Sequence, residues 1–504
     1  MALTKVHNRM ISQSVVNVRD FGAVGDGITD DGAAIQAAII YARDNSNVVG
    51  SGANAGKSRN IVYFPPGVYL TKQTPTFYTF INYEGMRATT VDAGADTTDQ
   101  SDSRGSIIRA DVAIYNNDNN TDGVLVYIPT GDITIRGLTF VGTAQINSNS
   151  SIGLQWGSAG GTATTGRPHE SIDGTGQNCS GVSVEYCSFY TFTKAWECNT
   201  MNDAYHYQVR FESNTTDVQF AYNPNVNNGQ SAKFSHSIFF AHSVGMAFSQ
   251  GTKYTVYVDN SSFDNIANST QHLVFTSTTA SDFNLKFTAV EFDHSGSSCF
   301  HALFNGNYDS KENDILFDGC SFNGDATNRA EFKVARASGT AAPENFAITN
   351  CTFKNSFVNF NIARECSVMN SRFKNGYITQ STSNRIDVFG NVFADYSGTG
   401  ITVATADCGY SYIRQNRFES ITTPISIFNN STNDTIICEN NIGVSASPAR
   451  GKFVDFVNGI TFANLGTPAD GSIVYCTDGT IANPVAGSGT GCIAKRLNGV
   501  WVGN

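Results

Sequence analysis

The sequence has few charged residues and no long hydrophobic run. Charged residues make up 15% of the 504 positions, against about 25% in an average globular protein. The 32 basic and 43 acidic residues leave a net charge of −11, which disfavours a nucleic-acid partner because such partners bind a basic face. No window reaches the roughly 18 consecutive apolar residues of a membrane span. With 40% hydrophobic residues, the chain should fold rather than stay disordered.

The sequence also lacks targeting and metal-binding patterns. Residues 1–7 contain no apolar core of the kind a secretory signal needs, so we expect synthesis and folding in a reducing cytosol. The 11 cysteines include no Cys-x-x-Cys pair, which disfavours both zinc fingers and a disulfide framework. We therefore expect no metal and no cofactor, and most cysteines as small buried apolar residues. Cys476 and Cys492 could pair or remain reduced.

The N-terminal region predicts one helix followed by a strand pair. Ala34, Ile35, Ala38 and Ile39 follow helical spacing, and Asp30 or Asp31 is placed as the N-cap, where negative charge suits the helix dipole. Residues 61–70 then indicate a strand, a Pro-Pro-Gly turn and a second strand. No second strong helix is expected.

A short sequence motif recurs from about residue 133 to residue 442. It consists of an aliphatic residue, four spacers and then usually Phe, followed by Asn, Asp, Ser or Gly. The clearest copies end at Phe140, Phe189, Phe263, Phe292, Phe322, Phe353, Phe373, Phe393, Phe418 and Ile442. From Phe263 onward the interval drifts between 20 and 31 residues, which excludes a fixed helical repeat and favours a coil of short strands with variable loops.

The position two residues before the terminal Phe shares its inward face, because strand side chains alternate. This position holds Cys187, Ser261, Cys320, Cys351, Ser371, Asn391, Asn416 and Asn440. Stacked rungs would place like residues about 4.8 Å apart. We therefore predict an all-β fold, a right-handed parallel β-helix, with residues 1–60 as neck and capping helix, 61–450 as β-helix and 451–504 as a small β module. A module of about fifty residues has a marginal core alone, so we expect three chains to interdigitate there.

Two segments carry a resemblance to a known family. The head, residues 20–39 (DFGAVGDGITDDGAAIQAAI) with FPPGVY at 64–69, resembles the head of pectate-lyase-like β-helices, in the form found in bacteriophage tailspike and tail-fibre depolymerases. The tail, residues 466–476 and 491–501, is similar to the C-terminal module of such tailspikes, notably those of Acinetobacter phages and prophages. The resemblance implies a homotrimer that grips and cleaves a host surface polysaccharide. It also implies attachment to the phage tail or baseplate, through a part not visible here.

The polygalacturonase relatives carry Gly-His-Gly and Arg-Ile-Lys signatures that this sequence lacks, and Asp-Asp occurs only at Asp30–Asp31. Their active site is therefore not transferred to this chain. A candidate site comes instead from the outward positions that flank the inward Phe, where acids gather at Asp264, Glu291 and Asp293.

Glycoside hydrolysis needs two carboxylates, about 6.5–9.5 Å apart for inversion. Asp264 and Glu291 would lie about 8 Å apart on a diagonal, and Glu291 and Asp293 about 6.7 Å apart on one strand. Like charges this close should raise one pKa, as a general acid requires. We hypothesise Glu291 as acid and Asp264 or Asp293 as base. The alternative is a solvated acidic patch.

Glu331 is the next candidate, with Lys333 and Arg336 nearby and with His272 and His301 on the equivalent strand of earlier rungs. This group could bind an anionic sugar, or Glu331 could form an ordinary surface ion pair. His294 could orient Asp293. Glu312 and Asp314 are a weaker carboxylate pair.

Sugar rings also pack on aromatic faces. The candidate aromatic residues for such packing are Trp196, Tyr254, Tyr257 and Tyr308. Trp196 fits a core or subunit contact better than a sugar platform.

The sequence thus favours a virion-tail depolymerase that hydrolyses capsular or exopolysaccharide, with a bacterial surface polysaccharide and two further copies of itself as partners. A polysaccharide lyase remains open because Lys354, Arg372 and Lys374 form a basic patch. A receptor-binding fibre without enzymatic activity also remains open. A secreted plant-wall pectinase is disfavoured by the missing signal segment and signatures.

Overall fold

The structure is a computed structural model. It describes residues 15–45, 48–49, 56–57, 60–87, 105–111, 123–129, 131–142, 151–157, 179–199, 201–221, 230–248, 253–265, 267–276, 282–306, 314–327, 329–336, 344–404, 408, 411–427, 437–443, 473–476 and 491–503. The chain divides into two compact units, residues 1–265 and 266–504.

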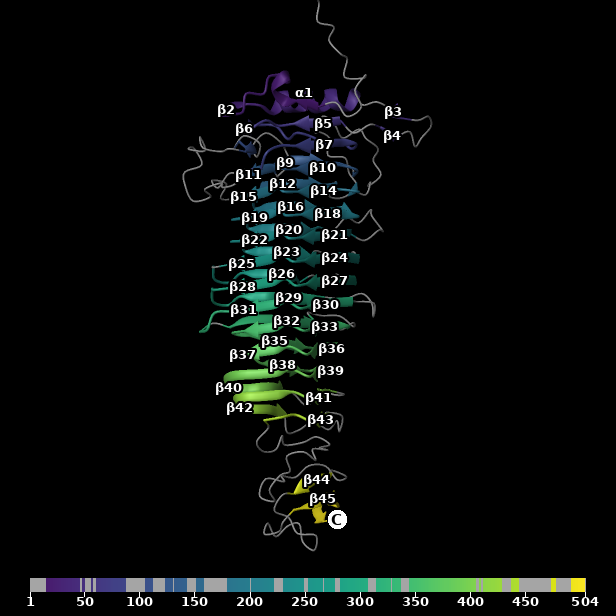
Figure 1. Cartoon of the computed structure of the whole chain (residues 1–504), viewed down its shortest axis with the longest axis vertical. Helices are drawn as coiled ribbons and strands as arrows, with labels where there is room; N and C mark the ends of the chain where they lie inside the picture. The colour runs from purple at the N-terminus through teal and green to yellow at the C-terminus, as the bar shows by residue number, and fades with distance from the viewer. Residues whose placement is uncertain are drawn as a thin grey trace, which may run out of the picture. The chain divides into compact units, whose positions relative to one another are not determined.

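The first unit begins with a cap. It comprises the 3-10 helix η2 (Val18–Phe21), strand β2 (Asp26–Asp30) and helix α1 (Gly32–Asp44), which packs against η2 and the first strands (Figure 1). The predicted helix is confirmed, with Asp31 at the N-cap position. The buried Asp31 carboxylate does not cap the helix but accepts the backbone N–H groups of Val24 and Gly25 at 2.7 and 3.0 Å. Gly25 has φ +71°, and an added Cβ would lie 3.0 Å from the Tyr69 ring, so the Gly-rich head motif serves this tight turn.

Parallel strands make up most of the first unit, in three stacks. The first stack is β1 (Val15–Asn17), β5 (Asn60–Tyr63), β7 (Ile81–Glu84), β10 (Thr134–Arg136), β14 (Ser183–Glu185), β18 (Ala204–Tyr207), β21 (Gln230–Ser235) and β24 (Lys253–Asp259). The second is β6 (Gly67–Thr71), β8 (Ser106–Ala110), β11 (Leu138–Val141), β15 (Ser188–Tyr190), β19 (Arg210–Glu212), β22 (Ile238–Phe240) and β25 (Ser262–Asn265). The third is β9 (Gly123–Ile128), β12 (Ser151–Trp156), β16 (Lys194–Cys198), β20 (Thr216–Phe220) and β23 (Val244–Phe248). Two small pairs complete the unit, parallel β13 (Cys179–Ser180) with β17 (Met201–Asn202) and antiparallel β3 (Val48–Val49) with β4 (Gly56–Lys57).

The second unit repeats this arrangement. Its first stack is β27 (Asp282–Thr288), β30 (Asp314–Asp318), β33 (Phe346–Thr349), β36 (Arg364–Met369), β39 (Asn384–Phe389), β41 (Tyr412–Arg414) and β43 (Ile437–Glu439). Its second is β28 (Glu291–His294), β31 (Ser321–Asn323), β34 (Thr352–Lys354) and β37 (Arg372–Lys374), and its third is β26 (Gln271–Phe275), β29 (Phe300–Gly306), β32 (Ala330–Arg336), β35 (Ser356–Asn361) and β38 (Ile378–Ser381). The long strands β40 (Val392–Val403) and β42 (Arg417–Ile427) continue these two stacks. The predicted parallel β-helix is confirmed.

The repeating phenylalanines form the predicted ladder within each unit. In the first unit, rings of successive rungs from Phe140 to Phe263 lie 4.2–5.4 Å apart and nearly parallel. In the second unit, the rings from Phe292 to Phe418 lie 4.5–5.1 Å apart. All of these rings are buried. The core of each unit is therefore a column of stacked aromatic side chains.

A second inward ladder runs beside the rings. In the second unit the backbone N–H of Cys351 donates to Ser371, that of Ser371 to Asn391 and that of Asn391 to Asn416, at 2.9–3.1 Å. The next member is Asn441, which accepts the Asn416 N–H at 3.0 Å. The prediction of Asn440 at this position is wrong by one residue. Asn440 takes the left-handed corner conformation (φ 54°), and Ile442 consequently pairs with Arg417 rather than Phe418.

The C-terminal strands are antiparallel: β44 (Ile473–Cys476), β45 (Cys492–Leu497) and β46 (Val500–Gly503). The Asn498-Gly499 turn has positive φ at both residues (49° and 76°), which confirms the predicted tight hairpin. Cys476 and Cys492 lie opposite each other across β44 and β45. The boundaries at residues 60 and 450 stay predictions. Within the described residues, no helix is long and apolar enough to cross a membrane.

Candidate functional site

The acidic pair of the second unit lies on strand β28. Glu291 is exposed, Phe292 is buried and Asp293 is half-buried. This alternation places both carboxylates on the outer side of one strand, two residues apart, or about 6.7 Å between Cα atoms. The Asn323 side-chain N–H donates to Glu291 Oε1 at 3.3 Å. Two outward side chains that leave one strand from Cα atoms at this spacing can hold their carboxyl groups at the distance that inverting glycoside hydrolysis uses.

The predicted outward columns are present in the register of the second unit. Glu291 is followed on successive rungs by Ser321, Thr352 and Arg372, and Asp293 by Asn323, Lys354 and Lys374. Lys354, Arg372 and Lys374 are all exposed. One face of the sheet therefore carries acids on its first rung and cations two and three rungs further on, within about 15 Å.

Asp264 belongs to the first unit, on β25. The column of outward side chains that leads to Asp264 is the predicted one. It consists of Tyr190, Glu212 and Phe240 on the preceding rungs. Glu291 and Asp293 belong to the second unit, so the spacing between Asp264 and Glu291 stays a prediction.

Glu331 lies on the outer side of β32, as predicted. Its Oε1 accepts a hydrogen bond from the Asn359 side chain at 2.7 Å. On the neighbouring rungs Phe300 and Phe357 are in register with it. Lys333 and Arg336 follow on the same strand at partly exposed positions. Glu331 is thus a carboxylate held by an amide, between two aromatic rings.

A second aromatic ladder on the outside of this unit was missed in the sequence analysis. Phe357 stacks on Tyr377 with ring centroids 4.7 Å apart, and Tyr377 stacks on Tyr396 at 5.2 Å. The three rings are partly exposed, and the Arg329 guanidinium lies 4.7 Å from the Tyr396 centroid. Partial burial raises the pKa of Tyr377. The signal was available, because each ring follows a ladder Phe by three or four residues.

Two of the proposed sugar-stacking residues are interior. Trp196 is fully buried on β16, with its ring against Phe189 and Phe211 at 5.3 and 5.0 Å. Tyr254 is fully buried on β24, edge-on to Phe248 at 5.3 Å. The prediction of a sugar platform is wrong for Tyr254, whereas the burial of Trp196 agrees with the core contact that the sequence analysis favoured over a platform.

Tyr257 remains a candidate, since it is 37% exposed on β24. It is in register with Lys233, whose ammonium is 2.9 Å from Asp259 and 5.8 Å from the Tyr205 ring centroid. Tyr308 and Glu312 lie outside the described residues, and Asp314 is exposed at the start of β30.

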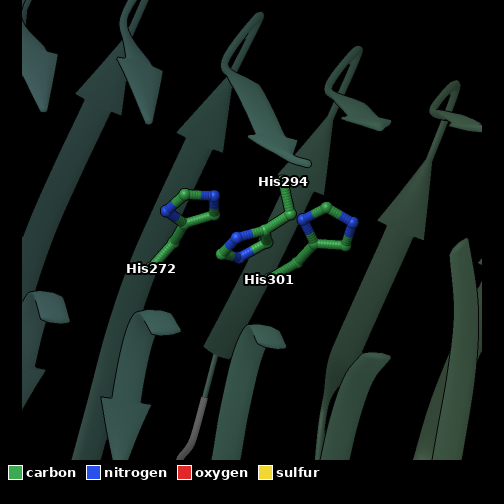
Figure 2. A group of neighbouring side chains, drawn as sticks. All are labelled: His272, His294 and His301. Carbon is green, nitrogen blue, oxygen red and sulfur yellow. The ribbon is translucent and has the colours of Figure 1, made fainter. Parts of the chain in front are cut away.

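The predicted roles of His294 and His301 at the surface are wrong. His294 and His301 are 1% and 0% exposed, and His272 is 0% exposed. His294 points inward because it is two residues after the inward Phe292 on the same strand. The three imidazoles gather inside the second unit (Figure 2), so they cannot contact a polymer at the outer face.

A buried carboxylate in the first unit was also missed. Glu197 on β16 is 5% exposed, and its oxygens accept from Lys194 Nζ at 2.5 Å and from the Gln155 side chain at 3.0 Å. Only the packing of β12 beside β16 shows this environment, because Gln155 precedes Glu197 by 42 residues.

Comparison with known proteins connects the head of the chain with carbohydrate-active enzymes. A family model described as "Rhamnogalacturonase A/epimerase, pectate lyase-like" matches residues 15–89. The mannuronan C5-epimerase AlgE6 of Azotobacter vinelandii is 49% identical over 53 residues, which is 10% of this chain and 5% of the epimerase. The chain thus matches only a small part of this curated relative's length.

Solved structures share the architecture at low identity. Tailspike protein 3 of bacteriophage CBA120 is 11% identical with a TM-score of 0.48, covering 97% of this chain and 68% of the tailspike chain. The surface adhesin PfbA of Streptococcus pneumoniae is 16% identical with a TM-score of 0.48, covering 82% of this chain and 100% of the adhesin chain. At these identities the likeness concerns the fold alone.

Proposed function

We propose that this protein is a tailspike-type depolymerase that binds a bacterial capsular or exopolysaccharide and cleaves it by endo-acting hydrolysis. The observation that carries the proposal is the pair Glu291 and Asp293, two residues apart on the outer side of one strand, from where the two carboxyl groups can flank a sugar as inversion requires. The match of the head to a pectate-lyase-like family model supports a carbohydrate substrate. The net charge of −11 does not oppose a sugar polymer as partner.

In this proposal Glu291 is the general acid. It donates its proton to the glycosidic oxygen as the bond to the anomeric carbon breaks, while Asp293 takes a proton from the water that attacks the opposite face of the sugar. Asp264 is the alternative base. Glu331 is the alternative acid, because Asn359 orients its carboxylate and aromatic rings flank it.

The outer ladder Phe357–Tyr377–Tyr396 would supply the sugar-stacking surface, since the C–H faces of pyranose rings pack on aromatic faces. Arg336 and Lys333, on the same strand as Glu331, would attract an anionic sugar. Tyr257 and Tyr308 remain further candidates for contact with the polymer.

The test is a set of charge-removing variants: Glu291→Gln, Asp293→Asn, Asp264→Asn and Glu331→Gln. Glu365→Gln is the matched control, because Glu365 is an exposed glutamate of the same unit paired with Arg385. Loss of a catalytic acid or base should lower kcat by about 10²–10⁴-fold with the fold unchanged by circular dichroism. If all four variants cleave the polymer as fast as the control, the hydrolase site is elsewhere.

A lyase is the second candidate, and the exposed cations Lys354, Arg372 and Lys374 favour it. They lie on the same sheet face as the acidic pair, where they could bind a uronic carboxylate and remove the neighbouring proton. A new carbon–carbon double bond in the products, seen as ultraviolet absorbance rising during digestion, would establish the lyase and end the hydrolase proposal. A polymer that binds but keeps its chromatographic size would instead indicate a receptor-binding fibre.

We also propose a homotrimer at the virion tail, assembled through the C-terminal hairpin. Its strands expose Ile493, Leu497, Val500 and Val502 at 39–56%, an apolar face that association would cover. Ile493→Asp should shift the sedimentation mass from trimer to monomer, whereas Ile28→Asp, at an 82% exposed isoleucine of the first unit, should leave the trimer intact. A trimer that survives Ile493→Asp together with Val500→Asp would place the contact elsewhere.

A further inference from the structure

Three histidines from separate strands meet inside the second unit. His272 lies on β26, His294 on β28 and His301 on β29, and all three are at most 1% exposed. One ring nitrogen from each can be chosen so that the three atoms lie within 4.8 Å of one another (Figure 2). The His272 and His294 rings are stacked, with centroids 3.8 Å apart.

Each ring is anchored through Nε2. His272 Nε2 lies 3.0 Å from the Asp293 carbonyl oxygen, and His294 Nε2 lies 3.0 Å from the Phe300 carbonyl oxygen. A carbonyl oxygen only accepts, so both rings carry their proton on Nε2. A neutral imidazole with Nε2–H has a lone pair on Nδ1.

His301 follows the same pattern. Its Nε2 lies 2.9 Å from Ser356 Oγ, and that hydroxyl is within 3.2 Å of the Phe322 carbonyl and 3.0 Å of the Lys354 carbonyl. The hydroxyl donates its single proton to a carbonyl and therefore accepts the proton of His301 Nε2. Among the residues the structure describes, His301 Nδ1 then has no hydrogen-bond partner, although an unmet buried acceptor is costly.

We propose that one ring nitrogen of each of His272, His294 and His301 binds one closed-shell transition-metal ion, with Cu(I) preferred. For His301 and His294 this nitrogen is Nδ1. His272 turns Nε2 toward the other two rings (Figure 2), so it would exchange its 3.0 Å contact with the Asp293 carbonyl oxygen for the ion and carry its proton on Nδ1. In His294 and His301, anchoring of the distal N–H by carbonyl or hydroxyl oxygens is the arrangement that orients metal-ligating histidines. Ligand atoms at about 2.0 Å in a trigonal plane lie about 3.5 Å apart, so the rings must close by about 1 Å. His294 Nδ1 would exchange its 3.2 Å contact with Thr270 Oγ1 for the ion.

Charge decides between Cu(I) and Zn(II). The group contains three imidazoles and no carboxylate or thiolate, and the cost of transferring an ion from water to an apolar interior grows with the square of its charge. Imidazole suits both metals, but a single positive charge without a carboxylate partner costs far less to bury. Because the site is closed to solvent, the ion would enter as the chain folds. This inference does not depend on the proposed polysaccharide activity.

The test is refolding of the full chain with Cu(I) under reducing conditions or with Zn(II), followed by removal of loose metal and measurement of metal per chain. We expect about one copper per chain, and an X-ray absorption spectrum with nitrogen ligands rather than sulfur. The requirement for nitrogen ligands matters because the 11 cysteines of the chain could bind copper through sulfur instead.

His301→Phe and His272→Asn should each abolish retention. His206→Phe is the matched control, because His206 is an equally buried histidine of the first unit and should leave copper content unchanged. The assignment would be overturned if the wild-type chain retained no metal or if its copper were bound by sulfur. It would also be overturned if both site variants retained as much copper as the wild type. Zinc retained in preference to copper would overturn the choice of Cu(I). The absorption spectrum of the wild-type chain decides the case even if a variant fails to fold.

Discussion

His206 should make the first unit sensitive to acid. Its ring is fully buried on β18, against Trp196 at 4.7 Å and Phe234 at 4.8 Å, and neither ring nitrogen has a hydrogen-bond partner among the described residues. Burial lowers the pKa of His206 from 6.5 to about 3. The unfolded state therefore binds one more proton than the folded state between these two pH values, so stability falls as pH decreases from about 6.5 to about 3.

The size of the effect follows from the two pKa values. At pH 4 the His206 ring is protonated in the unfolded chain, because its pKa of 6.5 there lies about 2.5 pH units higher, whereas in the folded chain the ring stays neutral. At 1.36 kcal/mol per unit, the loss relative to pH 7 is about 3 kcal/mol. This corresponds to a factor of about 200 in the population of the opened state.

The assay is hydrogen exchange of the β18 amides, read by mass spectrometry at pH 7 and pH 4 for the wild type and His206→Phe. Phe fits the aromatic surroundings and cannot take a proton, and any packing change it causes is common to both pH values. The protection of the β18 amides from exchange in His206→Phe, divided by their protection in the wild type, should be about 200-fold higher at pH 4 than at pH 7. An unchanged ratio would refute the reasoning, since it would mean that the ring is not held neutral by burial.

Three further predictions test the ladders. Phe353→Ala removes a buried ring that lies between neighbouring rings at 4.6 and 4.5 Å. It should lower the free energy of unfolding, measured in urea, by about 3–5 kcal/mol. A loss no larger than that caused by Phe357→Ala at the surface would contradict this. Asn416→Ala should lower the free energy of unfolding by about 1–3 kcal/mol for each buried group that loses its hydrogen-bond partner. The Asn416 side chain has two such partners, since it donates to the Val388 carbonyl and accepts from Asn391 N–H. Asn416→Ser should recover part of the loss by differential scanning calorimetry, as Ser371 serves this position on another rung, and equal losses would refute the ladder. Tyr377→Ala should weaken polysaccharide binding by about 3–10-fold in calorimetric titration, and Tyr412→Ala, exposed on another stack, should not; equal effects would remove the outer ladder from the binding site.

The sequence analysis predicted the inward positions well and several surface positions poorly. Phe, Cys and Asn recur at a constant offset, and alternation along a strand places them inside whatever the loop lengths are. The same rule correctly places Glu291, Asp293 and Glu331 outside. His294 was misplaced because its neighbour Asp293 was taken as its partner, although the two residues point to opposite sides of β28.

The buried carboxylate Glu197 shows the limit of strand alternation. Tyr254 and Tyr257 obey the rule, since they are three residues apart on one strand and face opposite sides, so that only Tyr257 is exposed. Glu197 has no unusual sequence context, and its burial depends on Gln155 and Lys194. Asn440 was assigned one position too early because the last rung pairs Ile442 with Arg417.

The sequence by itself determined that short strands would wind around a column of phenylalanines, because period-two alternation and a recurring motif are local properties of the chain. Only the tertiary structure decided which residues of different rungs become neighbours, such as His272, His294 and His301 in the interior or Phe357, Tyr377 and Tyr396 outside. The physical reason is that loops of varying length separate the rungs, so lateral contacts depend on how each strand registers with the next and not on distance along the chain.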